Sequence, residues 1–430
     1  GVAWSWPWTA GLATLTGLLL IGHFHRFRWA ALPMLVGLAG LLVGLGRGGW
    51  TLPWLGAAAV LYALLVWRLG IAALARPSVW RAARVLGFTA PGGAGGRQQV
   101  EESLRDGALL VAATIVAASP VLAGSGWPAP ELWPALAPSL LLFGLASWQD
   151  RSAPCAYAAL ATLTVGVWLT GDWLVPTPLF GLGQPLLNVM LSLVLATAAV
   201  GLEAERAASL AYWRAPLAVT GGLLYVLALA GTAPLGFLAT DLRLPVLLAL
   251  LCVALFPVAR FWPNAAAWRG LGLPVLLSAL VGSLADWIGC NAREGAWLAI
   301  VWGYALWSGG NLLLPRWNGR WPGWAVDPAL WPLLGLASVL GGGTVGVLDG
   351  VLSLAGLLAM LALYLFLLLR NTAWPGMAWL AVATLTASGL LASGALEWSW
   401  WGRSHDQSAT IRGCIVALVE LNLLFLLVPL

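Results

Sequence analysis

The residue of this sequence that could most readily take part in chemistry is Glu420, which lies near the middle of the last apolar run. Asn422 follows two positions later. A carboxylate placed in hydrocarbon is costly and is usually retained for a function. If Glu420 is buried among helices, it could take part in proton or cation handling. The alternative is that it is protonated, or hydrogen-bonded to a neighbouring helix or a partner subunit.

A second polar feature is a stripe of three residues spaced four apart, Gln184, Asn188 and Ser192, in the apolar run 179–202. A spacing of four places side chains on one face of an α-helix. We therefore expect the stripe to face protein and not lipid. It could line a polar pathway, or it could supply hydrogen bonds between helices.

The histidines and cysteines form no motif typical of a metal or redox site. His23 and His25 are two residues apart, so they do not share a helix face. The cysteines have no C-x-x-C spacing. Cys290 and Cys414 are both predicted near the outer face, where a disulfide is chemically possible. We expect no catalytic residue, no cofactor and no metal site.

One glycine pattern has the spacing of a dinucleotide-binding loop. Gly341, Gly343 and Gly346 satisfy G-x-G-x-x-G, which in nucleotide enzymes lets backbone amides approach a pyrophosphate between a strand and a helix. Here the flanking segments are long apolar runs instead. The sequence therefore predicts a tight turn that ends at Asp349.

The composition determines which elements must position these residues. Of the 430 residues, 61% are hydrophobic and 9% are charged, against roughly 25% charged in soluble domains. A helix needs about 20 apolar residues to cross a bilayer. We predict an all-α, polytopic integral membrane bundle of about fifteen transmembrane helices. Their ranges are 3–22, 30–46, 50–67, 107–124, 130–148, 153–171, 179–202, 214–235, 244–259, 270–289, 294–314, 329–346, 350–369, 375–395 and 411–430.

The basic residues predict an orientation. All 21 are arginine, and arginine accumulates in cytoplasmic loops. When the side alternates from one predicted span to the next, sixteen arginines fall on one side and five on the other. This places the first residue outside and the last inside. The lysine-free composition is typical of a GC-rich bacterial genome, so we expect the cytoplasmic (inner) membrane of a bacterium.

The longest segment between predicted spans is 69–106, on the cytoplasmic side. Its first part predicts an interfacial amphipathic helix with Arg76, Arg81 and Arg84 on the polar face. Glycines at 91–96 are expected to end that helix, and a charged connector begins at Arg97. These arginines could contact lipid headgroups or a partner, or the segment could be a solvated connector. The chain then divides into 1–68, with the first three spans, 69–106, and 107–430, with about twelve more in one continuous membrane domain.

The 29 tryptophans gather near the predicted span ends, including Trp321 and Trp324. Indole rings favour the headgroup level of a bilayer because they combine an apolar body with one N–H donor. We interpret them as membrane anchors.

These features favour a non-catalytic structural or assembly subunit of a larger membrane complex, with membrane lipids and other membrane subunits as partners. The alternative is a transporter or flippase for a lipid-linked or bulky substrate, which tolerates an apolar bundle with a few polar stripes. A membrane glycosyltransferase or an ion-translocating subunit comes third. An ion pump is disfavoured because such proteins carry several charged residues in the middle of their helices. A glycosyltransferase is disfavoured because it needs acidic residues in a large outer loop. The scattered arginines form no basic stripe for nucleic acid.

Overall fold

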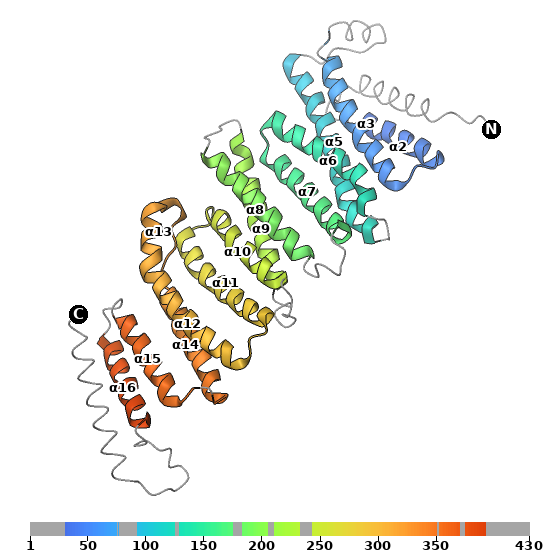
Figure 1. The fold of residues 1–430 in the computed structure, drawn as a ribbon. Helices are drawn as coiled ribbons and strands as arrows, with labels where there is room; N and C mark the ends of the chain where they lie inside the picture. Colours follow the sequence, from blue (N-terminus) through green and yellow to red (C-terminus); the bar gives the residue numbers. More distant parts are fainter. Residues whose placement is uncertain are drawn as a thin grey trace, which may run out of the picture. The chain divides into compact units, whose positions relative to one another are not determined.

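The computed structural model describes residues 31–74, 76, 93–124, 129–174, 183–204, 210–232, 243–350, 352–369 and 375–392. Regular structure throughout these ranges is helical (Figure 1). Contacts divide the chain into two compact units, residues 1–228 and 229–430. Each unit is described on its own.

Eight of the described helices are long and apolar enough to cross a membrane, and four shorter helices are also apolar. The chain is therefore an all-helical, multi-pass membrane protein. The eight segments are Leu52–Ala72, Val100–Ala123, Ala153–Gly171, Gln184–Glu203, Ala211–Thr232, Ala265–Ile288, Ala292–Arg320 and Trp331–Leu348. The predicted count of about fifteen spans is not supported. The predicted spans 3–22 and 411–430 lie outside the described residues.

Unit 1 contains seven described helices, the last of which crosses the boundary at residue 228. They are α2 (Ala31–Arg47), α3 (Leu52–Leu74), α5 (Gly93–Gly124), α6 (Ala129–Asp150), α7 (Ala153–Leu174), α8 (Gly183–Ala204) and α9 (Ala211–Thr232). Helices α3, α5 and α6 contact one another, with α2 and α7 beside them. Buried alanines such as Ala63, Ala108 and Ala146 line this core. Small side chains let helix backbones approach closely in a membrane.

Helix α5 begins much earlier than the sequence predicts. The segment expected to be a charged connector is helical from Gly93 onward. The reason is a continuous apolar face, because Val100, Leu104, Ala108 and Val111 are all buried at helical spacing. Arg76 is exposed just beyond the end of α3. The rest of the predicted amphipathic helix, including Arg81 and Arg84, lies outside the described residues.

Unit 2 is a series of helices that mostly pack against their neighbours along the chain. They are α10 (Arg243–Ala259), α11 (Ala265–Ile288), α12 (Ala292–Ser308), the π-helix η4 (Gly309–Leu313), α13 (Leu314–Arg320), the 3₁₀ turn η5 (Pro322–Trp324), α14 (Trp331–Leu348), α15 (Leu354–Leu369) and α16 (Pro375–Ala392). Contacts join α10 to α11, α12 to α14, α14 to α15, and α15 to α16. Helix α12 starts with a capping box between Asn291 and Glu294, which satisfies two amides that no helical carbonyl can reach.

The G-x-G-x-x-G segment does not form the predicted turn. Its glycines lie inside α14, and the chain turns only after the helix ends, at Gly350 with φ +67°. The glycines instead allow close helix packing. A Cβ added to Gly342 would lie 2.6 Å from the Ala299 Cβ of α12. The corresponding position on Gly343 would overlap Leu357 of α15.

The adjacent pair Gly341 and Gly342 gives a matched test of this packing. We expect Gly342→Ala to lower the free energy of unfolding by about 1–3 kcal/mol, because its methyl group must force α12 and α14 apart. Gly341→Ala adds a methyl with nothing within 4 Å, and should be neutral or slightly stabilising. Thermal unfolding of both variants in detergent measures the difference. Equal melting temperatures for the two variants would contradict the observed packing.

Candidate functional sites

The predicted polar stripe on α8 connects three helices. Trp168 of α7 donates its indole N–H to Asn188 Oδ1 at 2.6 Å. Ser192 Oγ donates to the carbonyl of Gly221 on α9, also at 2.6 Å. Both residues are buried, whereas Gln184 is exposed at the start of the helix. Two members of the stripe therefore make contacts between helices, and Gln184 does not join them.

The other predicted polar pair, Glu420 and Asn422, lies outside the described residues. The same holds for Cys414, so its pairing with Cys290 stays a prediction. Among the residues that the structure describes, Cys290 is a free thiol. Within those same ranges, no group of three or more His, Cys, Asp or Glu side chains could hold a metal ion.

Replacing Asn188 tests how much these contacts contribute to the free energy of unfolding. Asn188→Leu leaves the Trp168 indole N–H without its acceptor, so we expect a loss of about 0.6–2 kcal/mol in unfolding free energy. Gln184→Leu, one turn away and exposed, serves as the control and should change stability by less than about 0.5 kcal/mol. Unfolding in mixed detergent micelles gives both values. Equal losses in the two variants would argue against an interhelical role for Asn188.

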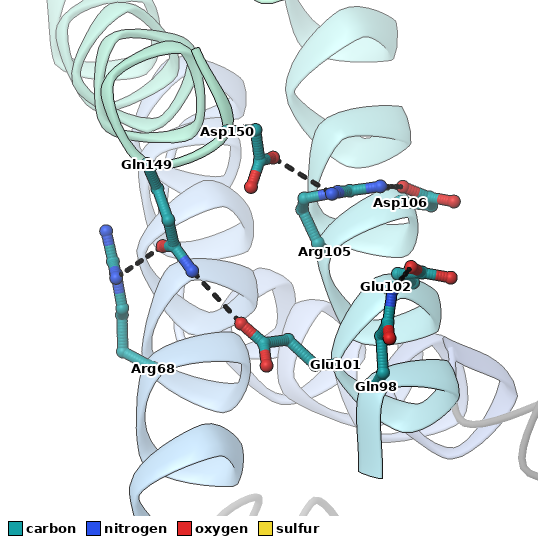
Figure 2. Close-up of polar contacts among 8 residues, drawn as sticks. All are labelled: Arg68, Gln98, Glu101, Glu102, Arg105, Asp106, Gln149 and Asp150. Carbon is teal, nitrogen blue, oxygen red and sulfur yellow. Dashed lines mark hydrogen bonds and ion pairs between the residues drawn. The ribbon is translucent and has the colours of Figure 1, made fainter. Parts of the chain in front are cut away.

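Polar side chains gather at the ends of α3, α5 and α6 and make three separate groups of contacts (Figure 2). Arg68 donates to Gln149 Oε1 at 2.8 Å, and the Gln149 amide donates to Glu101 Oε1 at 3.0 Å. Gln149 therefore bridges a cation on α3 to an anion on α5. The Arg68 guanidinium also stacks 4.5 Å from the ring of the fully buried Trp67. We call the following residues the charged end of unit 1: Arg68, Gln98, Glu101, Glu102, Arg105, Asp106, Gln149 and Asp150.

Arg105 connects α5 to α6 within the charged end. Its guanidinium pairs with Asp150 at 2.9 Å and with Asp106 at 3.0 Å (Figure 2). The charged end holds four carboxylates and two guanidinium groups, so its side chains carry a net negative charge. Sequence reasoning named only Arg97 in this region, and the side chain of Arg97 lies outside the described residues. The charged run near 100 was visible, but its partners near 150 required the fold.

A cavity of about 640 Å³ lies in unit 2, where α13 meets the loop that follows it. The sequence did not predict it. Its lining combines two arginines with aromatic and aliphatic side chains. The residues that matter most for its chemistry are Phe256, Arg316, Trp317, Arg320, Trp321 and Trp331. We call this the arginine–tryptophan cavity.

Behind this cavity lies a buried arginine, Arg269 of α11, which is only 2% exposed. Its Nη1 donates to the carbonyl of Ala325 at 3.1 Å and its Nη2 to that of Phe256 at 3.2 Å. The guanidinium carbon lies 5.5 Å from the centre of the Trp324 ring. Backbone carbonyls and an aromatic face thus offset part of the cost of the buried cation, whereas its Nε has no acceptor among the described residues. The loop is held against α11.

Further hydrogen bonds fix the same loop. Asn318 Nδ2 donates to the carbonyl of Val326 at 2.8 Å, and the Val326 amide donates back to Asn318 Oδ1 at 2.9 Å. Trp317 donates its indole N–H to the carbonyl of Trp324 at 3.2 Å. Gly270 allows the close approach, because a Cβ there would overlap the Asp327 carbonyl. Hydrogen bonds within the protein therefore fix this wall of the cavity.

No known protein family, curated protein or solved structure matches this chain. Function must consequently be argued from the geometry of the sites themselves.

Loss of the Arg269 guanidinium should release the loop. Arg269→Met leaves the carbonyls of Phe256 and Ala325 without their charged donors, at an expected cost of about 3 kcal/mol. Lysine should not substitute, because one ammonium group cannot reproduce the planar fork. Tryptic cleavage after Arg320 should become at least about tenfold faster. Arg293→Met, which removes an exposed arginine at the start of α12, should leave the cleavage rate unchanged; acceleration in that control would contradict the assignment.

Proposed function

We propose that this chain is a non-catalytic structural or assembly subunit of a larger membrane complex. The observation that carries the proposal is the charged end of unit 1. There, charged and polar side chains from three helices gather outside the apolar core and make three groups of contacts, two of which join one helix to another. We further propose that a partner subunit with basic side chains contacts this end.

The length of α5 supports this role. The helix has 32 residues, which corresponds to about 48 Å at 1.5 Å per residue. The hydrocarbon core is only about 30 Å thick. The charged residues of α5 precede an uncharged stretch that begins at Gly107, so they lie at the membrane boundary when that stretch spans the hydrocarbon. Asp106 pairs with Arg105 but is 64% exposed, so part of its carboxylate can also meet an incoming cation.

The polar groups inside both units support a scaffold as well. Asn188 and Ser192 join helices in unit 1. In unit 2, Tyr304 donates to the carbonyl of Met360 and Tyr364 to that of Pro332, both at 2.7 Å. These side chains are used for packing, and packing is what a structural subunit requires.

We propose the bacterial inner membrane as the location, with the first residue outside, the last inside and the charged end of unit 1 in the cytoplasm. When the side of the membrane alternates from one predicted span to the next, Arg68 and Arg105 fall on the same side. Their hydrogen bonds to Gln149 and Asp150 join both to the same end of α6. The same alternation places Arg260 and Arg269 on that side, and within unit 2 both bond to the carbonyl of Gly323. These local groupings support the alternation that the orientation requires.

Copurification of the full chain from its native membrane tests the proposal. We expect stoichiometric partner proteins with the unaltered chain, and about tenfold less of them with the charge reversal Glu102→Lys plus Asp106→Lys, because like charges would then face the partner. The control is Glu131→Lys, an exposed acid in the first turn of α6, far from the charged end of unit 1. A photo-crosslinking residue at position 102 should capture the same partner.

Three outcomes would contradict the proposal. The chain could purify without a stoichiometric partner, or the Glu131 control could lose the partner equally. The purified chain could also move a lipid-linked substrate across a vesicle membrane by itself, in which case the transporter or flippase alternative would replace the subunit role. Thermal unfolding shows whether the charge-reversal variant is folded. Asp106 is exposed, whereas Glu102 is half-buried and accepts a hydrogen bond from Gln98, so the comparison requires an unchanged melting temperature.

A further inference from the structure

The arginine–tryptophan cavity has a chemistry that the proposed subunit role does not use. Arg316 and Arg320 are four residues apart on α13, both exposed and both lining the cavity. Side chains at this spacing lie on one helix face. Among the described residues, neither arginine forms an ion pair with a carboxylate. The cavity thus has two guanidinium groups directed to one face and free to bind an anion.

The remaining lining is apolar and aromatic. Phe256, Leu273, Leu313 and Leu314 contribute aliphatic and ring surface, and Trp317 and Trp321 stand beside the arginines. A site that combines two cationic side chains with an apolar wall fits an amphiphile with an anionic headgroup. Arginine is well adapted to phosphate because its planar fork donates two parallel hydrogen bonds. Tryptophan favours the level of the glycerol and headgroup in a bilayer.

The cavity is also suitably built and sized. A volume of about 640 Å³ lies within the usual range of about 300–1,000 Å³ for small-molecule sites. The loop wall is fixed by Asn318 and Arg269. The helical wall contains the π-segment η4, whose glycines let Trp331 pack closely. A Cβ on Gly309 would lie 2.9 Å from the Trp331 ring, and one on Gly310 would lie 2.9 Å from the Trp331 Cβ. A fixed site loses little entropy when it binds a ligand.

We propose that the arginine–tryptophan cavity binds the phosphate headgroup of an anionic glycerophospholipid. Arg316 and Arg320 hold the phosphate, and Trp317, Trp321 and Trp331 surround the glycerol and the first acyl carbons. The site does not depend on the proposed subunit role, because a bound lipid is compatible with any function of this membrane domain.

Native mass spectrometry of the delipidated full chain, titrated with lipid, tests this proposal. We expect phosphatidylglycerol to bind about 30-fold more tightly than phosphatidylcholine, which corresponds to two arginines near a lipid surface. The double variant Arg316→Gln plus Arg320→Gln should lose this preference. Both positions are exposed, and an unchanged melting temperature would exclude misfolding as the cause. Arg293→Gln, an exposed arginine at the other end of the same helical segment, should keep the preference.

Several results would overturn the proposal. One is equal binding of the two lipids, and another is a preference that survives the double variant. Equal loss in the Arg293 control would indicate general charge attraction and no site. Competition by inorganic phosphate at the same concentration as the lipid would show that a free anion, and not a phospholipid, is the ligand.

Discussion

The structure depends most on one constraint: polar groups inside a membrane domain must find partners within the protein. Arg269 shows the constraint at its strongest. Its guanidinium is buried and has backbone carbonyls and aromatic rings as its surroundings. One of those carbonyls, that of Phe256, belongs to α10, and the other, that of Ala325, belongs to the loop after α13. The same logic explains why Asn188, Ser192 and Tyr364 each bond to another helix.

Close helix approach is the second determinant, and it follows from the first. When polar groups are satisfied locally, helices associate mainly through van der Waals contact, which favours small residues at the interface. Alanines do this between α3, α5 and α6, and glycines do it between α12 and α14. The two candidate sites occur where these packed helices end, because there the chain can carry charge without entering hydrocarbon.

The sequence predicted the helical membrane class and the approximate positions of most described helices, because apolar length is a strong signal. It did not predict the helical start of α5 at Gly93, since the charges at 97–106 obscured the buried face that begins at Val100. The glycines of α14 suggested a turn, because their packing partners on α12 and α15 are distant in the chain. The arginine–tryptophan cavity was missed for the same reason: Phe256, Trp317 and Trp331 come together only through the fold.

The π-segment η4 has a consequence for the direction in which α13 presents its side chains. A π-turn accommodates one residue more than the α-helical repeat, and each residue turns a helix by about 100°. Gly309–Leu313 therefore rotates Arg316 and Arg320 by about a quarter turn relative to the face that α12 buries against α14. A single inserted residue in an apolar run thus sets the direction of two charges, and a one-residue deletion there would realign the helix and point them elsewhere.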